Sequence, residues 1–295
     1  MDLTEFASAV GDSGPVSVHG LGSRRVRRDP SIDSGRFVIA PSGVSEYQPD
    51  EMTIACGAGT TLAELRAVTA TSRQFVALPG DGTVGGALAI GRSGIDRLGV
   101  GPVRDALLQV TFVDHRGRLV AAGGPTVKNV SGFDLARLLV GSFGRLGFIA
   151  HVILRTRPLP ANSRWFVTEA DAPRVSDLQS RLYRPAALLW DGRQLHVRLD
   201  GHADDITAAA RVHGLSEVAG PPVIDQPYRW SVAPSRVGAV VEAAHGRACG
   251  EVGVGIVHHV EPQPGRRETL DPIEARLFDE FDPHRRLNPD VLFPQ

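Results

Sequence analysis

Glycine is distributed unevenly along this chain, and that distribution limits what the first half can form. The sequence has 33 glycines in 295 residues, about 11%, where globular proteins average about 7%. They gather before Gly147 and become sparse after it. Glycine adopts positive φ angles and lets a backbone approach a ligand closely. The asymmetry therefore predicts a ligand site built into the first half.

The first glycine-rich loop runs from His19 to Arg24 with the sequence HGLGSR. Successive backbone N–H groups in such a turn form an anion-binding nest, to which Ser23 adds a hydroxyl and Arg24 or Arg25 a positive charge. The pattern favours a diphosphate ligand, and an ordinary surface turn is the alternative. A Rossmann site is excluded, because Arg25 stands where its third glycine belongs and no acid lies between residues 37 and 45.

Two further glycine-rich stretches have both a structural and a ligand-binding interpretation. Residues 79–87, PGDGTVGGA, lead into an apolar helix whose N-terminus favours phosphate groups. Paired Gly85 and Gly86 would equally permit close helix packing. In residues 141–147, GSFGRLG, glycine recurs at every third position. That spacing indicates either close packing or backbone that lies against a ring system.

Composition is that of a globular, intracellular protein. Apolar residues make up 42% of the chain and the formal charge is -1, so a core can form and neither nucleic acid nor an anionic membrane is indicated. Two cysteines, Cys56 and Cys249, form no disulfide or iron–sulfur framework. The N-terminus lacks an apolar signal segment, and no run approaches the ~18 apolar residues that span a bilayer. We expect a soluble, cytoplasmic protein.

Hydrophobic periodicity predicts an α+β chain whose pattern changes near residues 158–163, PLPANS. Before this point the expected elements are strands at 16–20, 36–41, 52–59 and 146–160, a hairpin at 106–124, and helices at 61–72, within 76–94 and at 134–141. After it they are strands at 165–170, 186–191, 194–199 and 251–257, and helices at 172–183, 203–214, 237–245 and 271–281.

Eight ordered segments resemble the PCMH-type FAD-binding domain of the vanillyl-alcohol oxidase superfamily, and within it the glycolate oxidase FAD-binding subunits. The segments are GLGSR, YQPDEMT, AGTTLAEL, TVGGALA, GPVRD, VKNVSGFD, GSFGRLG and FDPHRRLNP. They extend over residues 16–160 and 271–293. Eight motifs in one order are far more specific than any single loop.

The resemblance implies an α+β fold in three parts. Residues 1–160 would form the FAD-binding domain from two α+β subdomains, and residues 161–270 a reduced α+β cap on the substrate side. Residues 271–295 would return to the FAD-binding domain.

The resemblance also implies which residues bind FAD. The loop at 20–24 would wrap the diphosphate, residues 83–87 and Gly94 would line the flavin and ribityl chain, and residues 141–149 would run along the isoalloxazine and adenine. Lys128 would be a charge partner of the flavin or of Asp134, or form an ordinary ion pair. The complete set is Gly20, Leu21, Gly22, Ser23, Arg24, Pro79, Gly80, Thr83, Val84, Gly85, Gly86, Ala87, Gly94, Arg104, Asp105, Lys128, Gly132, Asp134, Gly141, Ser142, Gly144, Gly147 and Ile149.

Several positions depart from the family pattern. Leu21 replaces a loop glycine, Arg24 stands where lysine is usual, and Phe133 replaces a tyrosine. Gly99 lies where an aromatic residue is common, which implies a more open wall on the substrate side. Ser23 occupies the position where some relatives attach FAD through a histidine, so we expect noncovalent FAD.

The implied activity is that of an FAD-dependent oxidoreductase acting on CH–OH groups, as a subunit of a glycolate oxidase-like complex for 2-hydroxy acids. A second flavin subunit, which itself could hold the substrate, and an iron–sulfur subunit would be its partners, and they would hold it at the inner face of the membrane. A stand-alone alcohol or hydroxy-acid oxidoreductase and a non-catalytic FAD-binding assembly subunit are the alternatives.

No catalytic residue is assigned from the sequence. His258 is a candidate base, with a structural histidine as the alternative, and scattered arginines such as Arg193, Arg198 and Arg229 belong to no common motif. No metal is expected, because adjacent His258 and His259 would diverge on a strand and the E-H-G and G-D-G-N-x-H motifs of metal-bearing relatives are absent.

Overall fold

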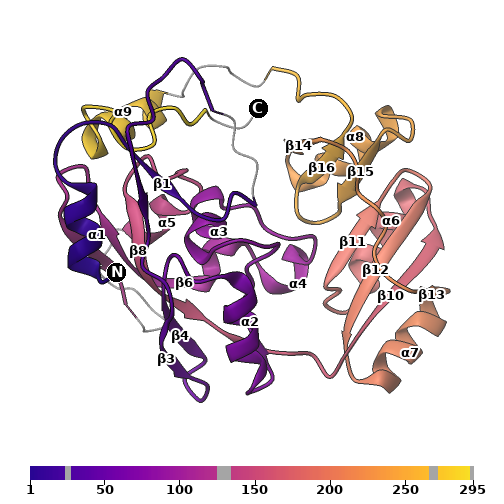
Figure 1. Ribbon diagram of the computed structural model, residues 1–295. Coiled ribbons are helices and arrows are strands. Elements are labelled where there is room, and N and C mark those ends of the chain that lie inside the picture. The colour runs from indigo at the N-terminus through magenta and orange to yellow at the C-terminus, as the bar shows by residue number, and fades with distance from the viewer. Residues whose placement is uncertain (24–27, 125–133, 266–271, 293–295) are drawn as a thin grey trace. The chain divides into compact units, whose positions relative to one another are not determined.

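The structure is a computed structural model that describes residues 1–23, 28–124, 134–265 and 272–292. The chain divides into two compact units (Figure 1). Unit 1 comprises Met1–Gly94, Pro102–Leu159 and Arg267–Pro294, and unit 2 comprises Ile95–Gly101 and Pro160–Arg266. The sequence patterns placed Ile95–Gly101 with the first half, whereas the structure assigns this segment to unit 2. The mixture of helices and sheets confirms the α+β class.

Unit 1 contains a five-stranded antiparallel sheet with the strand order β3-β4-β8-β6-β7. Its central strand, β8, begins with three successive buried residues, because it has a neighbour on each side and side chains on both faces are covered. The strands are β3 (Val44–Gln48), β4 (Thr53–Gly57), β6 (Leu107–Val113), β7 (Leu119–Gly123) and β8 (Phe148–Arg155).

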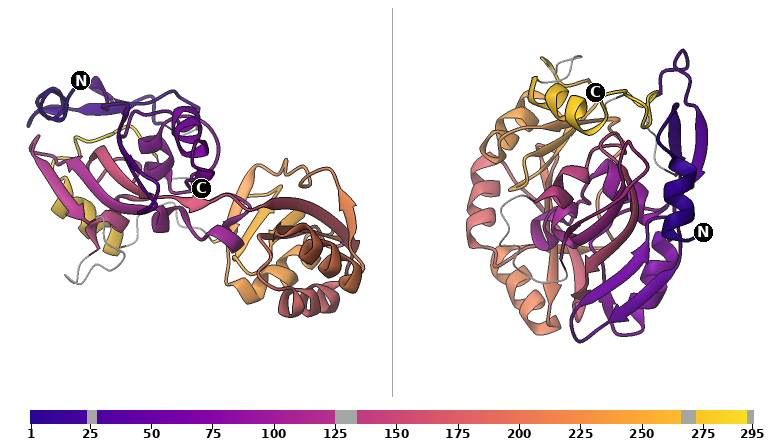
Figure 2. Two further views of the ribbon diagram at one scale, coloured as in Figure 1. Left: turned by 90° about the horizontal axis from the view of Figure 1, so that it is seen from below. Right: turned by 90° about the vertical axis from the view of Figure 1, so that its left-hand side faces the viewer.

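Two short strand pairs complete the sheet structure of unit 1. β1 (Val16–His19) and β2 (Arg36–Ile39) are parallel, and β5 (Gln74–Phe75) pairs with β9 (Arg157–Pro158). The C-terminal segment extends the first pair, since Leu287 bridges to Val16. In Figure 2 this segment, drawn in yellow, runs beside the indigo strands.

Capping residues set where the helices of unit 1 begin. Asp2 and Glu5 form a complete capping box on α1 (Leu3–Val10), and the Thr61 hydroxyl accepts from the Glu64 N–H at 3.0 Å at the start of α2 (Leu62–Ala70). The remaining described helices are α3 (Val84–Ile90), η1 (Val103–Ala106), α5 (Leu135–Leu139) and α9 (Pro272–Phe281).

One hydrophobic core joins the beginning, middle and end of unit 1. Phe6 from α1, Leu62 from α2, Leu88 from α3 and Leu154 from β8 are fully or almost fully buried in it. Leu287, near the C-terminus, is 1% exposed in the same core. The C-terminal segment therefore packs as a part of unit 1.

Unit 2 is built on a seven-stranded antiparallel sheet with the order β13-β10-β12-β11-β15-β16-β14. Side chains along β12 point alternately to the two faces of the sheet, and every second residue from Leu195 to Leu199 is buried. The strands are β10 (Asn162–Glu169), β11 (Ala187–Trp190), β12 (Gln194–Gly201), β13 (Ser216–Val218), β14 (Tyr228–Ser231), β15 (Ala248–Glu251) and β16 (Ile256–His259).

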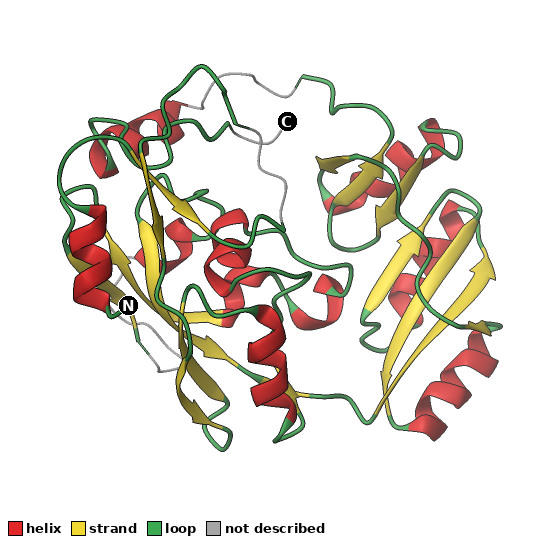
Figure 3. Cartoon of the chain, in the orientation of Figure 1, coloured by secondary structure: helices red, strands yellow, loops and turns green. Residues whose placement is uncertain are grey.

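Three helices accompany this sheet in unit 2 (Figure 3). They supply apolar side chains to one core with it. Val175, Ile206 and Val241 come from the three helices, and Trp190 of β11 is 1% exposed among them. The helices are α6 (Ala172–Arg181), α7 (Ala203–His213) and α8 (Val237–Ala243), and two shorter elements, α4 (Arg97–Val100) and η2 (Pro234–Arg236), also belong to unit 2.

The single strand expected at 251–257 is wrong. The chain turns in that interval, because β15 ends at Glu251 and β16 begins at Ile256. Gly253 and Gly255 have φ angles of 79° and 87°, which a continuous strand of L-residues does not adopt. The glycines thus convert one apolar run into a hairpin.

Candidate functional site

Unit 1 contains a cavity of about 880 Å³. Cofactor and small-molecule sites in proteins have volumes of roughly 300–1,000 Å³. Separate parts of the sequence form its wall: the end of β1 with residues 20–23, Arg28, residues 39–40 and 58–59, residues within 83–90 and 143–149, and the C-terminal segment. The cavity therefore brings together the glycine-rich stretches of the first half.

The first glycine-rich loop lines this cavity with five residues, His19 to Ser23. Gly22 has a φ of 65°, and a Cβ added there would meet no atom within 4 Å, so backbone conformation rather than crowding requires glycine. A Cβ on Gly20 would lie 3.0 Å from the Thr83 Oγ1. The Ser23 hydroxyl donates to the Asp81 carbonyl at 3.2 Å and so ties this loop to the second one.

The second loop contributes Thr83, Gly85 and Gly86 to the cavity wall. The Thr83 hydroxyl caps α3 by accepting from the Gly86 N–H at 3.2 Å. A Cβ on Gly85 would lie 2.9 Å from the Ala58 Cβ, so this glycine also permits close packing. Both interpretations of the pair, packing and a ligand-facing backbone, thus apply at once.

In the third stretch Gly144, Gly147 and Ile149 line the cavity. Gly147 has a φ of 150°, and its added Cβ would lie 2.4 Å from a ring atom of Phe112. The added Cβ of Gly144 would lie 2.5 Å from the Asn288 Nδ2. Close packing against neighbours and exposure to the cavity coexist here too.

Of the 23 residues predicted for the site, ten line the cavity and ten lie elsewhere in the described chain. The ten that line it are Gly20, Leu21, Gly22, Ser23, Thr83, Gly85, Gly86, Gly144, Gly147 and Ile149. Those elsewhere are Pro79, Gly80, Val84, Ala87, Gly94, Arg104, Asp105, Asp134, Gly141 and Ser142. Arg24, Lys128 and Gly132, like Phe133, lie outside the described residues.

The predicted residues outside the wall have local structural contacts. Val84 and Ala87 are 0% and 2% exposed and point into the core of unit 1. Asp134 caps α5 and forms an ion pair with Arg137 at 2.8 Å. Gly99 packs in unit 2, where an added Cβ would lie 2.8 Å from the Ala186 Cα, so close packing accounts for the lack of a side chain there.

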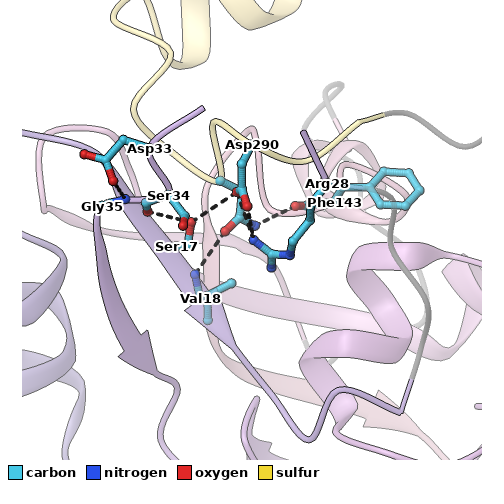
Figure 4. A network of polar contacts seen from close by, with 9 residues as sticks. Ser17, Val18, Arg28, Asp33, Ser34, Gly35, Phe143 and Asp290 are labelled. Carbon is cyan, nitrogen blue, oxygen red and sulfur yellow. Dashed lines mark hydrogen bonds and ion pairs between the residues drawn. The ribbon is translucent and has the colours of Figure 1, made fainter. Parts of the chain in front are cut away.

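The C-terminal segment was expected to return to the FAD-binding domain, but none of its residues was predicted for the site. The Asn288 Oδ1 accepts from the Val18 N–H at 3.0 Å, and its Nδ2 donates to the Phe143 carbonyl at 2.7 Å. Figure 4 shows the surrounding network, in which Arg28 meets Asp290. Asn288, Val291 and Arg28 all line the cavity. The terminal motif FDPHRRLNP was a usable signal, because it contains Asn288.

In unit 2 the candidate base His258 has a carboxylate partner. Its Nε2 lies 2.9 Å from the Glu251 Oε1, and the Glu251 side chain is 2% exposed. Arg229 stands opposite His258 across the β14–β16 ladder. His259 instead stacks on Trp230 at 4.1 Å between ring centroids. The two histidines diverge, as expected for adjacent residues on a strand.

No cluster of three or more histidine, cysteine or acidic side chains suited to a metal ion occurs in the described ranges. No helix in those ranges has the length and apolar character needed to cross a bilayer.

The sequence matches the family described as FAD binding domain over residues 5–123. The chain is 28% identical to glycolate oxidase subunit GlcE of Escherichia coli (strain K12) over 74% of its own length and 65% of that protein's. It is 32% identical to glycolate oxidase subunit GlcD of Bacillus subtilis (strain 168) over 36% of its own length and 24% of that protein's. The chain thus spans somewhat under two thirds of the GlcE length.

The fold resembles that of an alkyldihydroxyacetonephosphate synthase structure. The TM-score is 0.66 at 13% sequence identity, and the match covers 93% of this chain and 72% of the synthase chain. At this identity the likeness concerns the fold. The matched family, the two subunits and the fold agree with the resemblance read from the eight motifs, and residues 5–123 are an FAD binding domain of the matched family.

Proposed function

We propose that this chain is the FAD-binding subunit of a 2-hydroxy-acid oxidoreductase complex and that it holds FAD noncovalently in the cavity of unit 1. The likeness to the glycolate oxidase subunit GlcE over 74% of the chain carries the proposal. Bound FAD supplies the hydride acceptor for oxidation of a CH–OH group. The chain's own residues bind and orient that cofactor.

The cavity wall has the chemistry that a flavin dinucleotide requires. Gly20 and Gly22 present backbone without side chains to the cavity, which suits a diphosphate. The N–H groups of Gly85 and Gly86 already donate to the Ala58 carbonyl and the Thr83 hydroxyl, so at these two positions the missing side chains only leave room for a ligand. Ala89, Ile90 and Ile39 provide apolar surface for a ring system. The open space beside the Gly22 Cα is available to a ligand.

Noncovalent binding is supported by Ser23 at the position of the attaching histidine in some relatives. A serine hydroxyl forms no such link to the flavin, and here it donates to the Asp81 carbonyl. Acid precipitation of the purified yellow protein should therefore release all flavin into the supernatant. Flavin that stays with the pellet would contradict noncovalent attachment.

The redox behaviour of the isolated chain tests whether it works as one subunit of a complex. The subunit names of its relatives support a complex of several subunits. In the proposed complex a second flavin subunit would hold the substrate and an iron–sulfur subunit would take electrons. Anaerobic mixing of the isolated chain with excess glycolate or lactate should leave the flavin spectrum oxidised, or bleach it slowly. Rapid stoichiometric bleaching would contradict the subunit role.

One observation favours a second candidate function, a stand-alone hydroxy-acid oxidoreductase. The buried Glu251 carboxylate holds the Nε2 of His258, and such a pair fixes the tautomer in which the other ring nitrogen accepts a proton. If the isolated chain bleaches with glycolate and His258→Ala abolishes the bleaching, this function replaces the first. An unaffected variant would leave His258 a structural residue.

A further inference from the structure

The cavity wall contains one permanently charged side chain among its described residues. Arg28 is that side chain, and His19 is the only other ionisable group in the described wall. A diphosphate carries negative charge that backbone N–H groups meet only in part. Charge-assisted hydrogen bonds from a guanidinium are shorter and about twice as strong as neutral ones. Arg28 is therefore the group whose chemistry matches the most polar portion of a dinucleotide.

Arg28 is held in place by the C-terminal segment. Its Nη1 donates to both carboxylate oxygens of Asp290, at 2.9 and 2.7 Å (Figure 4). The backbone on either side is tied to the same segment, because Arg28 bridges to Val291 and the Asp29 N–H donates to the Asp290 carbonyl at 2.7 Å. A side chain 262 residues away in sequence thus fixes this arginine.

The ion pair is oriented with its positive end at the cavity. The Asp290 side chain is 6% exposed and is absent from the wall, whereas the Arg28 side chain is 37% exposed and forms part of it. Both bonds to Asp290 come from Nη1. Within the described chain no residue accepts from Nε or Nη2, whose three N–H groups remain for a second acceptor.

We propose that Arg28 binds the diphosphate of the bound dinucleotide and that Asp290 is the positioning residue that holds its guanidinium at the cavity wall. This assignment rests on the proposed function, in which FAD occupies the cavity. The Arg28 side chain is 37% exposed but the Asp290 side chain only 6%, so loss of Arg28 leaves a buried carboxylate without its cation and also lowers stability. The assignment is therefore decided by the difference between ligands with and without a diphosphate, which a general loss of stability does not produce.

The test compares three ligands on the full-length apo chain by calorimetric titration: FAD and ADP, which contain a diphosphate, and riboflavin, which does not. Arg28→Gln should weaken FAD and ADP roughly 10- to 150-fold, the range for loss of one hydrogen bond to a charged group. Riboflavin affinity should change less than about threefold. Arg28→Lys should retain part of the FAD affinity, because lysine meets phosphate as a point charge.

Asp290 is tested through coupling with Arg28. Asp290→Asn should weaken FAD and ADP but not riboflavin, and the double variant should bind no more weakly than Arg28→Gln alone. Equal weakening of all three ligands, or of none, by Arg28→Gln would overturn the assignment. Additive losses in the double variant would overturn the positioning role of Asp290. If Asp290→Asn fails to fold, Asp290 is needed for folding, and a role limited to positioning Arg28 is rejected. The Arg28 variants still decide whether Arg28 contacts the diphosphate.

The proposed function and the Arg28 assignment fail in different ways. If the wild-type chain binds ADP through Arg28 but not FAD, the flavin function fails and the diphosphate site stands. If it binds FAD and Arg28→Gln binds FAD and ADP equally well, the assignment fails and the flavin function stands. A wild-type chain that binds neither ligand would overturn both.

Discussion

Gly22 offers a sharp test of the cavity at the level of one residue. Its positive φ costs an L-residue about 1–2 kcal/mol, while an added side chain meets open space. Gly22→Asn and Gly22→Asp have nearly the same shape and both tolerate this conformation. We expect Gly22→Asp to abolish FAD binding, because its carboxylate enters the phosphate-binding loop, and Gly22→Asn to weaken it moderately. Flavin fluorescence titration measures both. Equal FAD affinities of the two variants would show that the charge of the aspartate does not matter, and that this loop does not bind the phosphates.

The two cysteines give a prediction for thiol chemistry and pH. Burial raises the pKa of Cys56 and of Cys249 to about 12 each. Because the thiolate is the reactive form, neither should react with a thiol reagent at about pH 8 until the chain unfolds. The folded chain keeps these protons where the unfolded chain loses them. The free energy of unfolding should therefore fall by up to about 1.4 kcal/mol per cysteine per pH unit between about pH 9 and 12, and not below.

A double Cys→Ala variant is the control for this pH dependence. Urea unfolding at about pH 8 and about pH 10 should show a smaller difference in free energy for the variant than for the wild-type chain, because the variant lacks both titrating groups. The same difference in both proteins would show that other groups govern stability in alkali.

Thr83 caps helix α3 and also lines the cavity. Its hydroxyl accepts from the Gly86 N–H at 3.2 Å, and it lies 3.0 Å from where a Cβ on Gly20 would stand, so the cap of α3 lies beside the first loop. Thr83→Ala should lower the free energy of unfolding by about 1 kcal/mol and weaken FAD binding. Thr83→Ser keeps the acceptor and should preserve both. Urea unfolding and flavin titration measure the two effects. Equal stability and equal FAD affinity of the two variants would contradict the capping role.

Elements with a strong local signal were predicted from the sequence, and elements defined by distant partners were not. The Thr61 cap and the spacing of Leu62 and Leu65 indicated α2. Strand β3 was missed because its residues are mostly exposed and polar. The residues between Glu251 and Ile256 seemed to form one strand because the pattern was apolar on both sides of the glycine turn.

The motifs pointed to the loops that line the cavity, but they did not predict which residues of those loops face it. The motifs located the glycine stretches, yet they did not indicate that Val84 and Ala87 turn to the core while Gly85 and Gly86 face the cavity. On a helix this choice depends on what covers each side, which the sequence does not state. The pairing of Arg28 with Asp290 depends on the fold of the whole unit and leaves no local pattern.

At the scale of the whole molecule, Arg286 joins the two ends of the chain. The residue is 4% exposed, and burial lowers the pKa of its guanidinium. Its three nitrogens donate to five carbonyl oxygens, which belong to Val10, Gly11, Ser13, Gly14 and His115. A buried charge with this many acceptors is satisfied. Removing it would leave the Gly11, Gly14 and His115 carbonyls without this donor, whereas those of Val10 and Ser13 also accept from Arg36.

Removal of residues 282–295 should therefore destabilise unit 1 and lower its flavin affinity, although the deleted residues lie far in sequence from every glycine-rich loop. The deletion takes away Arg286, the buried Leu287 and the Asn288 bonds to Val18 and Phe143. The point variant Arg286→Met, which keeps the length of the chain, should share the fall in melting temperature. Glu280→Gln, an exposed change on α9, is the matched control and should leave both properties unchanged. A truncated chain with full flavin content and an unchanged melting temperature would refute the structural role of this segment, because each buried carbonyl left without a donor costs about 1–3 kcal/mol.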